Sequence, residues 1–284
     1  MKTLLIATDF SANARHVATY GYHLAKQLRA NIVLCHALNV PSECLQTGTV
    51  PWPAEVYNDL VQDSEKALAQ LKRRLSADVG SQDYQPDIVC TQEAGFVKDV
   101  LNTVAETYKA DMILIGMHSK DALSTFMLGN HTRRMIEASV RPLLLVPQVW
   151  TARPVKKIGL CLDLNQDKDG HLIKELVAFA KLLDAEVVLT HVDPKVNAPD
   201  HGLRATELIE NLSSELDYKK ISFKVVANDN IEDGISWFTR NEHIDILAMI
   251  RHEHSFLNEV IKGSNTKRTA RQLSVPLFIL KSNS

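Results

Sequence analysis

The chain has 284 residues, 45% of them hydrophobic, which is enough for two domains of ordinary size with a core each. Its 32 basic residues are offset by 34 acidic ones, so it lacks the basic excess of a dedicated nucleic-acid-binding protein. No apolar run reaches the roughly 20 residues that a bilayer span needs, and no signal-peptide pattern follows Met1, so we expect a cytoplasmic protein without a membrane partner.

An internal repeat organises the predicted elements in chain order. Each half opens on a short apolar run that ends in a carboxylate, at Asp9 and at Asp163. The matched strands are 2–9 with 156–163, 28–36 with 183–191, 110–116 with 244–250, and 140–146 with 275–280. A weaker third strand is predicted in each half, near 87–91 and near 222–227. Four correspondences in one order indicate a duplicated domain.

Between the predicted strands, the apolar residues recur with the period of helices. Val17, Leu24 and Leu28 give one example in the first half. Strands that alternate with helices predict right-handed crossovers and a parallel sheet covered on both faces. We therefore expect an α/β fold of two tandem doubly wound five-stranded domains, 1–149 and 154–284, joined by a short linker near 148–154.

Ligands of such sheets bind beyond the carboxyl ends of the strands, where the strand order reverses. Asp9 follows the first strand, and Gly116 ends the fourth strand. In the order 3-2-1-4-5 these two strands are neighbours, so both residues are expected to face one crevice. The stretch Gly129-Asn130-His131-Thr132 opens a helical run, with Asn130 as a candidate N-cap, and free N–H groups at a helix start suit a phosphate chain.

Here the sequence resembles the universal stress protein family, whose nucleotide-binding members carry Gly-x-x-Gly, nine residues, then Gly-Ser or Gly-Thr. Residues 116–130 match that spacing. Further likeness comes from Thr8-Asp9-Phe10-Ser11, from Leu34-Cys35-His36-Ala37, and from the run 141–147. The resemblance covers both halves and implies a Rossmann-like fold, similar to that of adenine nucleotide alpha hydrolases.

The resemblance also implies a site for ATP or a related adenine nucleotide, with or without Mg²⁺. Asp9 would hold the ribose, and the backbone around Ala7 and Ala37 would flank the adenine. The residues expected to line the site are Ala7, Thr8, Asp9, Ala37, Gly116, Met117, Ser119, Gly129, Asn130, His131 and Thr132. The last strands of the two halves, 143–146 and 277–280, would pair as in family dimers, which makes one chain a pseudo-dimer and leaves a further homodimer open.

The sequence departs from the family pattern in both halves. Ser119 stands where the family has its second glycine, at a cost of about 1–2 kcal/mol if a left-handed backbone is required there. In the second half, Ile250 and Glu253 stand where the two earlier glycines belong. We therefore expect the first half to hold the nucleotide site and the second half to be degenerate.

Structural roles compete with these functional ones. Asp9 and Asp163 can cap the helices that follow them. His36 and His191 lie at strand ends among apolar residues, where a hydrogen-bonded core histidine is commoner than a ligand or a base. The cluster 251–254 carries two histidines but suggests no third metal ligand, and the four scattered cysteines form no CxxC pair, so no metal site is predicted.

Three functions remain open from the sequence. The first is a nucleotide-binding regulatory module of the stress response. The second is slow ATP hydrolysis, although no Walker motif and no residue to position an attacking water is evident, so no catalytic residue is assigned. The third is an interaction scaffold that binds no nucleotide, which the substitutions at Ser119, Ile250 and Glu253 favour.

Overall fold

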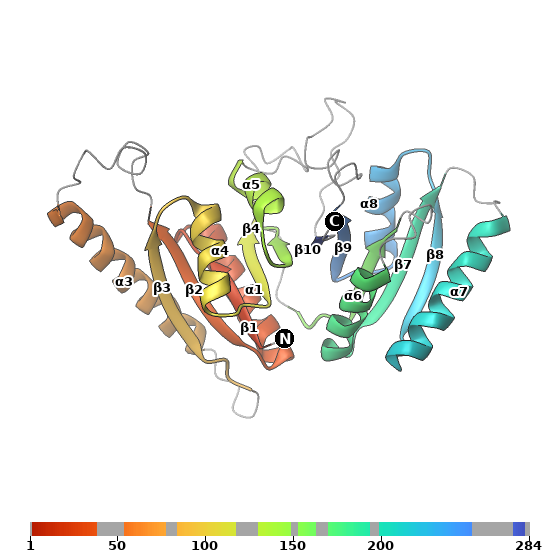
Figure 1. The fold of residues 1–284 in the computed structure, drawn as a ribbon, viewed down its shortest axis with the longest axis horizontal. Coiled ribbons are helices and arrows are strands. Elements are labelled where there is room, and N and C mark those ends of the chain that lie inside the picture. The colour runs from red at the N-terminus through yellow and green to blue at the C-terminus, as the bar shows by residue number, and fades with distance from the viewer. Residues whose placement is uncertain are drawn as a thin grey trace. The chain divides into compact units, whose positions relative to one another are not determined.

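The computed structural model describes residues 2–38, 54–77, 84–117, 130–148, 153–162, 170–193, 199–251 and 275–281. The chain forms two compact units that divide between Arg153 and Pro154. Each unit alternates strands and helices (Figure 1). Within the described residues, no helix combines the length and the apolar character that a membrane crossing requires.

The first unit is an open, fully parallel sheet with helical crossovers. Its elements are β1 (Thr3–Ala7), α1 (Ala12–Leu28), β2 (Asn31–Leu38), α3 (Ala54–Ser76), β3 (Ile88–Ala94), α4 (Val97–Thr107), β4 (Met112–Gly116), α5 (Asn130–Ala138) and β5 (Leu143–Val146). The strands lie in the order β3-β2-β1-β4-β5 (Figure 1), which confirms the predicted order.

The second unit repeats this topology. Its elements are β6 (Lys157–Cys161), α6 (Gly170–Leu183), β7 (Glu186–Asp193), α7 (Pro199–Leu216), β8 (Ile221–Ala227), α8 (Ile231–Asn241), β9 (Ile246–Arg251) and β10 (Leu277–Lys281). Its strands are also parallel and lie in the order β8-β7-β6-β9-β10. The predicted duplication is therefore present element by element.

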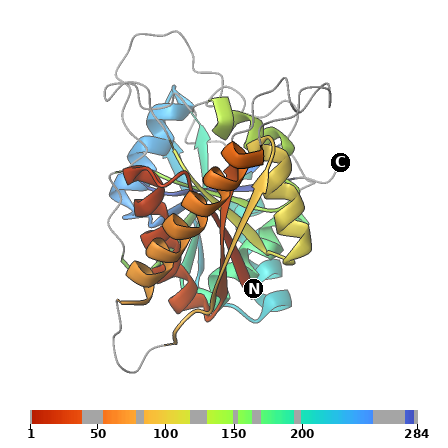
Figure 2. The same cartoon turned by 90° about the vertical axis from the view of Figure 1, so that its left-hand side faces the viewer.

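Helices cover both faces of the first unit's sheet. α1 packs on β1 and β4, α3 packs on β2 and β3, and α4 packs on β1 and β2. Figure 2 shows α3 on one side of the strands and α4 on the other. Because both faces are covered, the central strand is apolar throughout, and Leu4, Leu5 and Ile6 are fully buried.

The two units also share details that the apolar pattern does not reveal. Asp111 Oδ2 accepts two backbone N–H groups at the start of β1, at 2.6 and 2.9 Å, and Asp245 Oδ2 does the same at the start of β6, at 2.9 and 3.0 Å. Arg29 and Asp184, which follow α1 and α6, both adopt a φ of 53°. In both units, an aspartate just before the fourth strand thus binds the start of the first strand, and a residue with positive φ follows the first helix.

The third strand of the first unit is longer than predicted, whereas β8 agrees with the predicted strand near 222–227. β3 continues to Ala94, beyond the expected end near Thr91, because Ala37 and Leu38 of β2 pair with Glu93 and Ala94. The burial along β3 is uneven, since only its first residue is buried, so no clean alternation marks its end in the sequence. Backbone pairing with β2 sets the length of this strand.

Candidate functional site

The candidate site of the first unit lies at the carboxyl ends of β1 and β4. β1 pairs with β2 on one side and with β4 on the other, so the strand order reverses between β1 and β4. Asp9 follows β1 by two residues, and Gly116 is the last residue of β4. The prediction that these strands are neighbours at the switch point is therefore confirmed.

The turn after β1 is built by side chains that accept backbone hydrogen bonds. Thr8 is buried, and its Oγ1 accepts the N–H of Phe10 at 3.0 Å. Asp9 is exposed, and its Oδ1 accepts the N–H of Ser11 at 3.0 Å. The carboxylate of Asp9 therefore stands at the solvent edge of the crevice, held by the turn in which it lies.

Ser11, and not Asp9, is the N-cap of α1. Its Oγ accepts the N–H of Ala14 at 3.1 Å, and its backbone is extended with φ −61° and ψ 165°. The competing structural role for Asp9, a helix cap, is thus taken by its neighbour. Asp163, its counterpart, lies outside the described residues.

The rings of Phe10 and His36 pack against each other at this turn. Phe10 has a φ of 61°, which is unusual for an aromatic residue, and its ring centroid lies 4.6 Å from that of His36. His36 Nδ1 donates to the carbonyl oxygen of Thr8 at 2.7 Å. Since a carbonyl can only accept, the Nδ1 of His36 carries a proton in this bond. His191 Nδ1 makes the same bond to Leu162 at 3.0 Å, so the structural role of both histidines is confirmed.

Gly116 has a packing reason to be glycine. A Cβ there would lie 2.4 Å from the side-chain nitrogen of Asn13 and 3.3 Å from Val17 of α1. Asn13 is buried, and its Nδ2 donates to the carbonyl oxygen of Met117 at 3.3 Å, while its Oδ1 is buried without a partner. Gly116 therefore lets α1 approach the end of β4 and fix the direction in which the chain leaves the sheet.

Asn13 was missed in the sequence analysis. A signal was available, because Asn13 falls on the same helical face as Val17 and Leu24, which are buried. A polar residue on an apolar helical face needs a buried partner, and such partners are often at a site. The partner here is the first residue of the loop that follows β4.

The backbone N–H groups of two predicted site residues already donate hydrogen bonds to neighbouring strands. The N–H of Thr8 donates to Cys35 at 2.9 Å, and the N–H of Met117 donates to Val146 at 2.9 Å. Ala7 and Ala37 are half-buried near the ends of β1 and β2, where small side chains leave room beside the crevice.

The remaining predicted residues belong to the phosphate side. A helix begins where the sequence predicted one, but Asn130 is the first residue of α5 and not the N-cap that was predicted, and His131 follows it. Thr132 is buried in the first turn of α5. Ser119 and Gly129 lie outside the described residues. Among the described residues, the structure thus places Ala7, Ala37 and Gly116 at the carboxyl ends of the neighbouring strands β1, β2 and β4, with Thr8, Asp9 and Met117 just beyond the ends of β1 and β4.

In the second unit, Ile250 occupies the position of Gly116. Gly116 is two residues beyond Leu114, which pairs with Ile6, and Ile250 is two residues beyond Ala248, which pairs with Leu160. Ile250 is buried, so the second unit carries a buried apolar side chain at the strand position where the first unit has none. Glu253 lies outside the described residues.

The second unit also carries bulkier residues where the first has alanines. By strand register, Cys161 stands for Ala7 and Val192 stands for Ala37. Val192 packs against Gly234 of α8, where a Cβ would lie 2.5 Å from it, so part of this change is compensated inside the core. Among the described residues, no group of three metal-binding side chains is found.

Comparisons with known proteins agree with this architecture. The model of the universal stress protein family matches residues 1–147 and 154–281. Universal stress protein Slr1230 of a Synechocystis strain is 22% identical over 99% of this chain and 100% of its own length. Universal stress protein MJ0577 of Methanocaldococcus jannaschii is 26% identical over 51% of this chain and 94% of its own. A universal stress protein structure from Archaeoglobus fulgidus has a TM-score of 0.75 and 14% identity over 98% of both chains, which shows the same fold.

Proposed function

Because this chain belongs to the universal stress protein family over both of its halves, we propose that its first unit binds an adenine nucleotide, ATP or its relatives ADP and AMP, and acts as a regulatory module of the stress response in the cytoplasm. The observation that supports the proposal is that β1, which the exposed Asp9 follows by two residues, and β4, which ends at Gly116, are neighbours where the strand order reverses.

The residues present fit the ribose and adenine part of a nucleotide. An exposed carboxylate held by its own turn can accept hydrogen bonds from two ribose hydroxyls without reorganising. Ala7 and Ala37 are half-buried at the ends of β1 and β2, and their small side chains would let a planar base lie against the backbone there. The phosphates would then extend toward the start of α5, where Asn130 and His131 lie in the first turn at the positive end of a helix.

A bound nucleotide would bring negative charge next to the loop after β4. The chain itself holds the first residue of that loop in place. The two hydrogen bonds of Met117, to Asn13 and to Val146, fix where that loop starts. A ligand that binds one conformation of the chain better than another would shift the population toward it and change what a partner meets, which is a regulatory and not a catalytic role.

The test is to purify the full chain without added ligand, denature it, and identify any released nucleotide by mass. We expect ATP, ADP or AMP, and we expect Gly129→Glu to abolish the signal, since a carboxylate beside a phosphate chain costs several kcal/mol at an effective dielectric of about 20. If the protein comes out empty, equilibrium dialysis against ATP, with and without Mg²⁺, replaces the first measurement. No binding in either experiment would leave the scaffold function in place of the nucleotide-binding one.

Slow ATP hydrolysis is the alternative in the enzyme class. It predicts phosphate release above background that Gly129→Glu abolishes together with binding. Nucleotide that is bound but stays intact over many hours would exclude hydrolysis and keep the regulatory module.

We also propose that the last strands of the two halves, β5 and β10, pair within one chain in the manner of family dimers. Single cysteines introduced in 143–146 and 277–280 would then cross-link within a monomer under mild oxidation. Cross-links found only between chains would contradict the intramolecular pairing and support a homodimer.

A further inference from the structure

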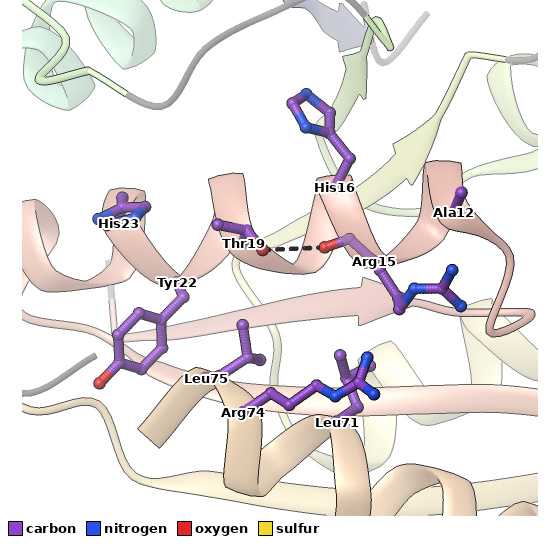
Figure 3. Close-up of a pocket in the computed structure, with 9 residues that line it drawn as sticks. All are labelled: Ala12, Arg15, His16, Thr19, Tyr22, His23, Leu71, Arg74 and Leu75. Atoms are coloured by element: carbon purple, nitrogen blue, oxygen red, sulfur yellow. Dashed lines mark hydrogen bonds between the residues drawn. The ribbon is translucent and has the colours of Figure 1, made fainter. Parts of the chain in front are cut away.

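A pocket of about 390 Å³ lies between α1 and α3, the two helices on one face of the first unit's sheet (Figure 3). α1 contributes Ala12, Arg15 and Thr19 to its wall, and α3 contributes Leu71, Arg74 and Leu75. None of these residues belongs to the proposed nucleotide site. The volume falls within the range of pockets that hold small molecules, about 300–1,000 Å³.

Among the residues that the structure describes, the pocket is lined by two arginines and by no acidic residue. Arg15 and Arg74 are both exposed, and Figure 3 shows the side chain of Arg74 running toward the end of the pocket where Arg15 lies. No acidic residue occurs in 12–28, the whole of α1, or in 66–76, the second half of α3. Two guanidinium groups thus share a pocket whose walls supply no counter-charge.

The hydrogen bonds leave most of the donors of these two side chains available. Arg15 Nη1 donates to the carbonyl oxygen of Phe10, which positions its guanidinium and uses one of five N–H groups. For Arg74, the described residues provide no hydrogen bond or ion pair. Planar guanidinium groups bind phosphate and carboxylate oxygens in pairs of parallel hydrogen bonds, so the two together match one dianionic group.

The second unit shows how the same helix pair looks without this feature. There α6 and α7, which correspond to α1 and α3, are joined by an ion pair between Lys174 Nζ and Glu215 Oε1 at 2.6 Å. The cation on α6 is therefore neutralised by the neighbouring helix. In the first unit the neighbouring helix adds a second cation instead.

From these observations we infer that the pocket between α1 and α3 is a binding site for a small phosphate monoester. A phosphate group carries about −1.5 to −2 charges at neutral pH, which balances Arg15 and Arg74. Leu71 and Leu75 beneath the arginines offer the apolar part of the ester a surface in the same pocket. The site is separate from the proposed nucleotide site and does not depend on it.

The experiment is a calorimetric titration of the full chain with phenyl phosphate at low ionic strength. We expect binding of one equivalent, weakened about tenfold by Arg74→Ala and by Arg15→Ala, as the loss of a charge-assisted contact predicts. The matched control is Arg73→Ala, which removes the same charge from the adjacent exposed position of α3 without lining the pocket, and it should change the affinity less than about twofold.

Three results would overturn the inference. They are no binding by the unmodified chain, equal weakening by Arg73→Ala and Arg74→Ala, and loss of binding in Gly129→Glu, which would place phenyl phosphate at the nucleotide site. Gly129→Glu that loses ATP but keeps phenyl phosphate supports the inference and separates it from the proposed function. Circular dichroism of each variant confirms that the exposed substitutions leave the fold intact.

Discussion

Gly116 is the residue at which the two units of this chain diverge in chemistry. Its missing side chain lets Asn13 of α1 reach Met117, whereas Ile250 fills the same position in the second unit with a buried side chain. The two units therefore differ in side-chain volume at the end of equivalent strands, and in the first unit the small residue makes room for the bond between Asn13 and Met117.

We predict that Gly116→Ala destabilises the first unit by about 1–3 kcal/mol, because the new Cβ would displace the Asn13 amide and break its bond to Met117. Urea denaturation measures the change. The control is Gly170→Ala at the start of α6, where nothing lies within 4 Å of the new Cβ and a change near zero or slightly stabilising is expected. Equal effects of the two substitutions would contradict the packing role of Gly116.

Burial determines the reactivity of Cys35. It raises the pKa of this thiol from 9.0 to about 12, with a smaller contribution from the nearby charge of Glu93. The folded chain therefore keeps the thiol neutral while the unfolded chain ionises it, so its contribution to stability is complete below about pH 9 and is lost as the pH rises toward about 12.

We accordingly predict that the free energy of unfolding falls more steeply between about pH 9 and 11 in the unmodified chain than in Cys35→Ala, by up to about 1.4 kcal/mol per pH unit. Denaturation curves at several pH values measure both slopes. Parallel slopes would show that Cys35 titrates alike in the folded and the unfolded chain.

At the scale of elements, the sequence allowed Asp9 either to cap α1 or to bind a ligand, and the structure gives the capping role to Ser11. Ser11 holds the first turn of the helix, and Asp9 holds the turn before it while its carboxylate stays exposed. A cap stabilises the helix whether or not a ligand is present, whereas a ribose contact matters only to binding.

The two roles predict opposite phenotypes. Ser11→Ala should cost about 1 kcal/mol of stability, the usual value of a lost N-cap, and leave nucleotide affinity nearly unchanged. Asp9→Ala should weaken nucleotide binding more than about tenfold and lower stability by less than Ser11→Ala, since the hydrogen bond it loses to the N–H of Ser11 is at an exposed position. Thermal denaturation and equilibrium dialysis measure the two properties, and a reversed pattern would assign the cap role to Asp9.

At the scale of the whole molecule, the two units share their topology and several hydrogen bonds, but they differ in the side chains at the ends of their strands. Equivalent carboxylates, Asp111 and Asp245, join equivalent strand starts, and His36 and His191 make equivalent bonds. The small residues at the strand ends of the first unit are replaced by Cys161, Val192 and Ile250 in the second.

This asymmetry predicts one nucleotide per chain. A calorimetric titration with ATP should give a stoichiometry near one, and Gly129→Glu should bring it near zero because the second unit cannot substitute. A stoichiometry near two, or binding that survives in Gly129→Glu, would show that the buried Ile250 does not block the second unit.

The sequence by itself determined the duplicated α/β architecture, the strand order and the adjacency of the two strands that carry Asp9 and Gly116 at their carboxyl ends. It could do so because apolar periodicity and chain connectivity are local signals, and parallel sheets follow from them by few rules. The register also bears out the sequence alignment that put Ile250 in place of Gly116.

Only the tertiary structure decided what the individual side chains do. The anchoring of Met117 by Asn13, the capping by Ser11 in place of Asp9, and the pocket shared by Arg15 and Arg74 all join residues that are polar or distant in sequence. Such contacts depend on which helices pack side by side on a sheet and how closely they approach, which the periodicity of a single segment does not specify.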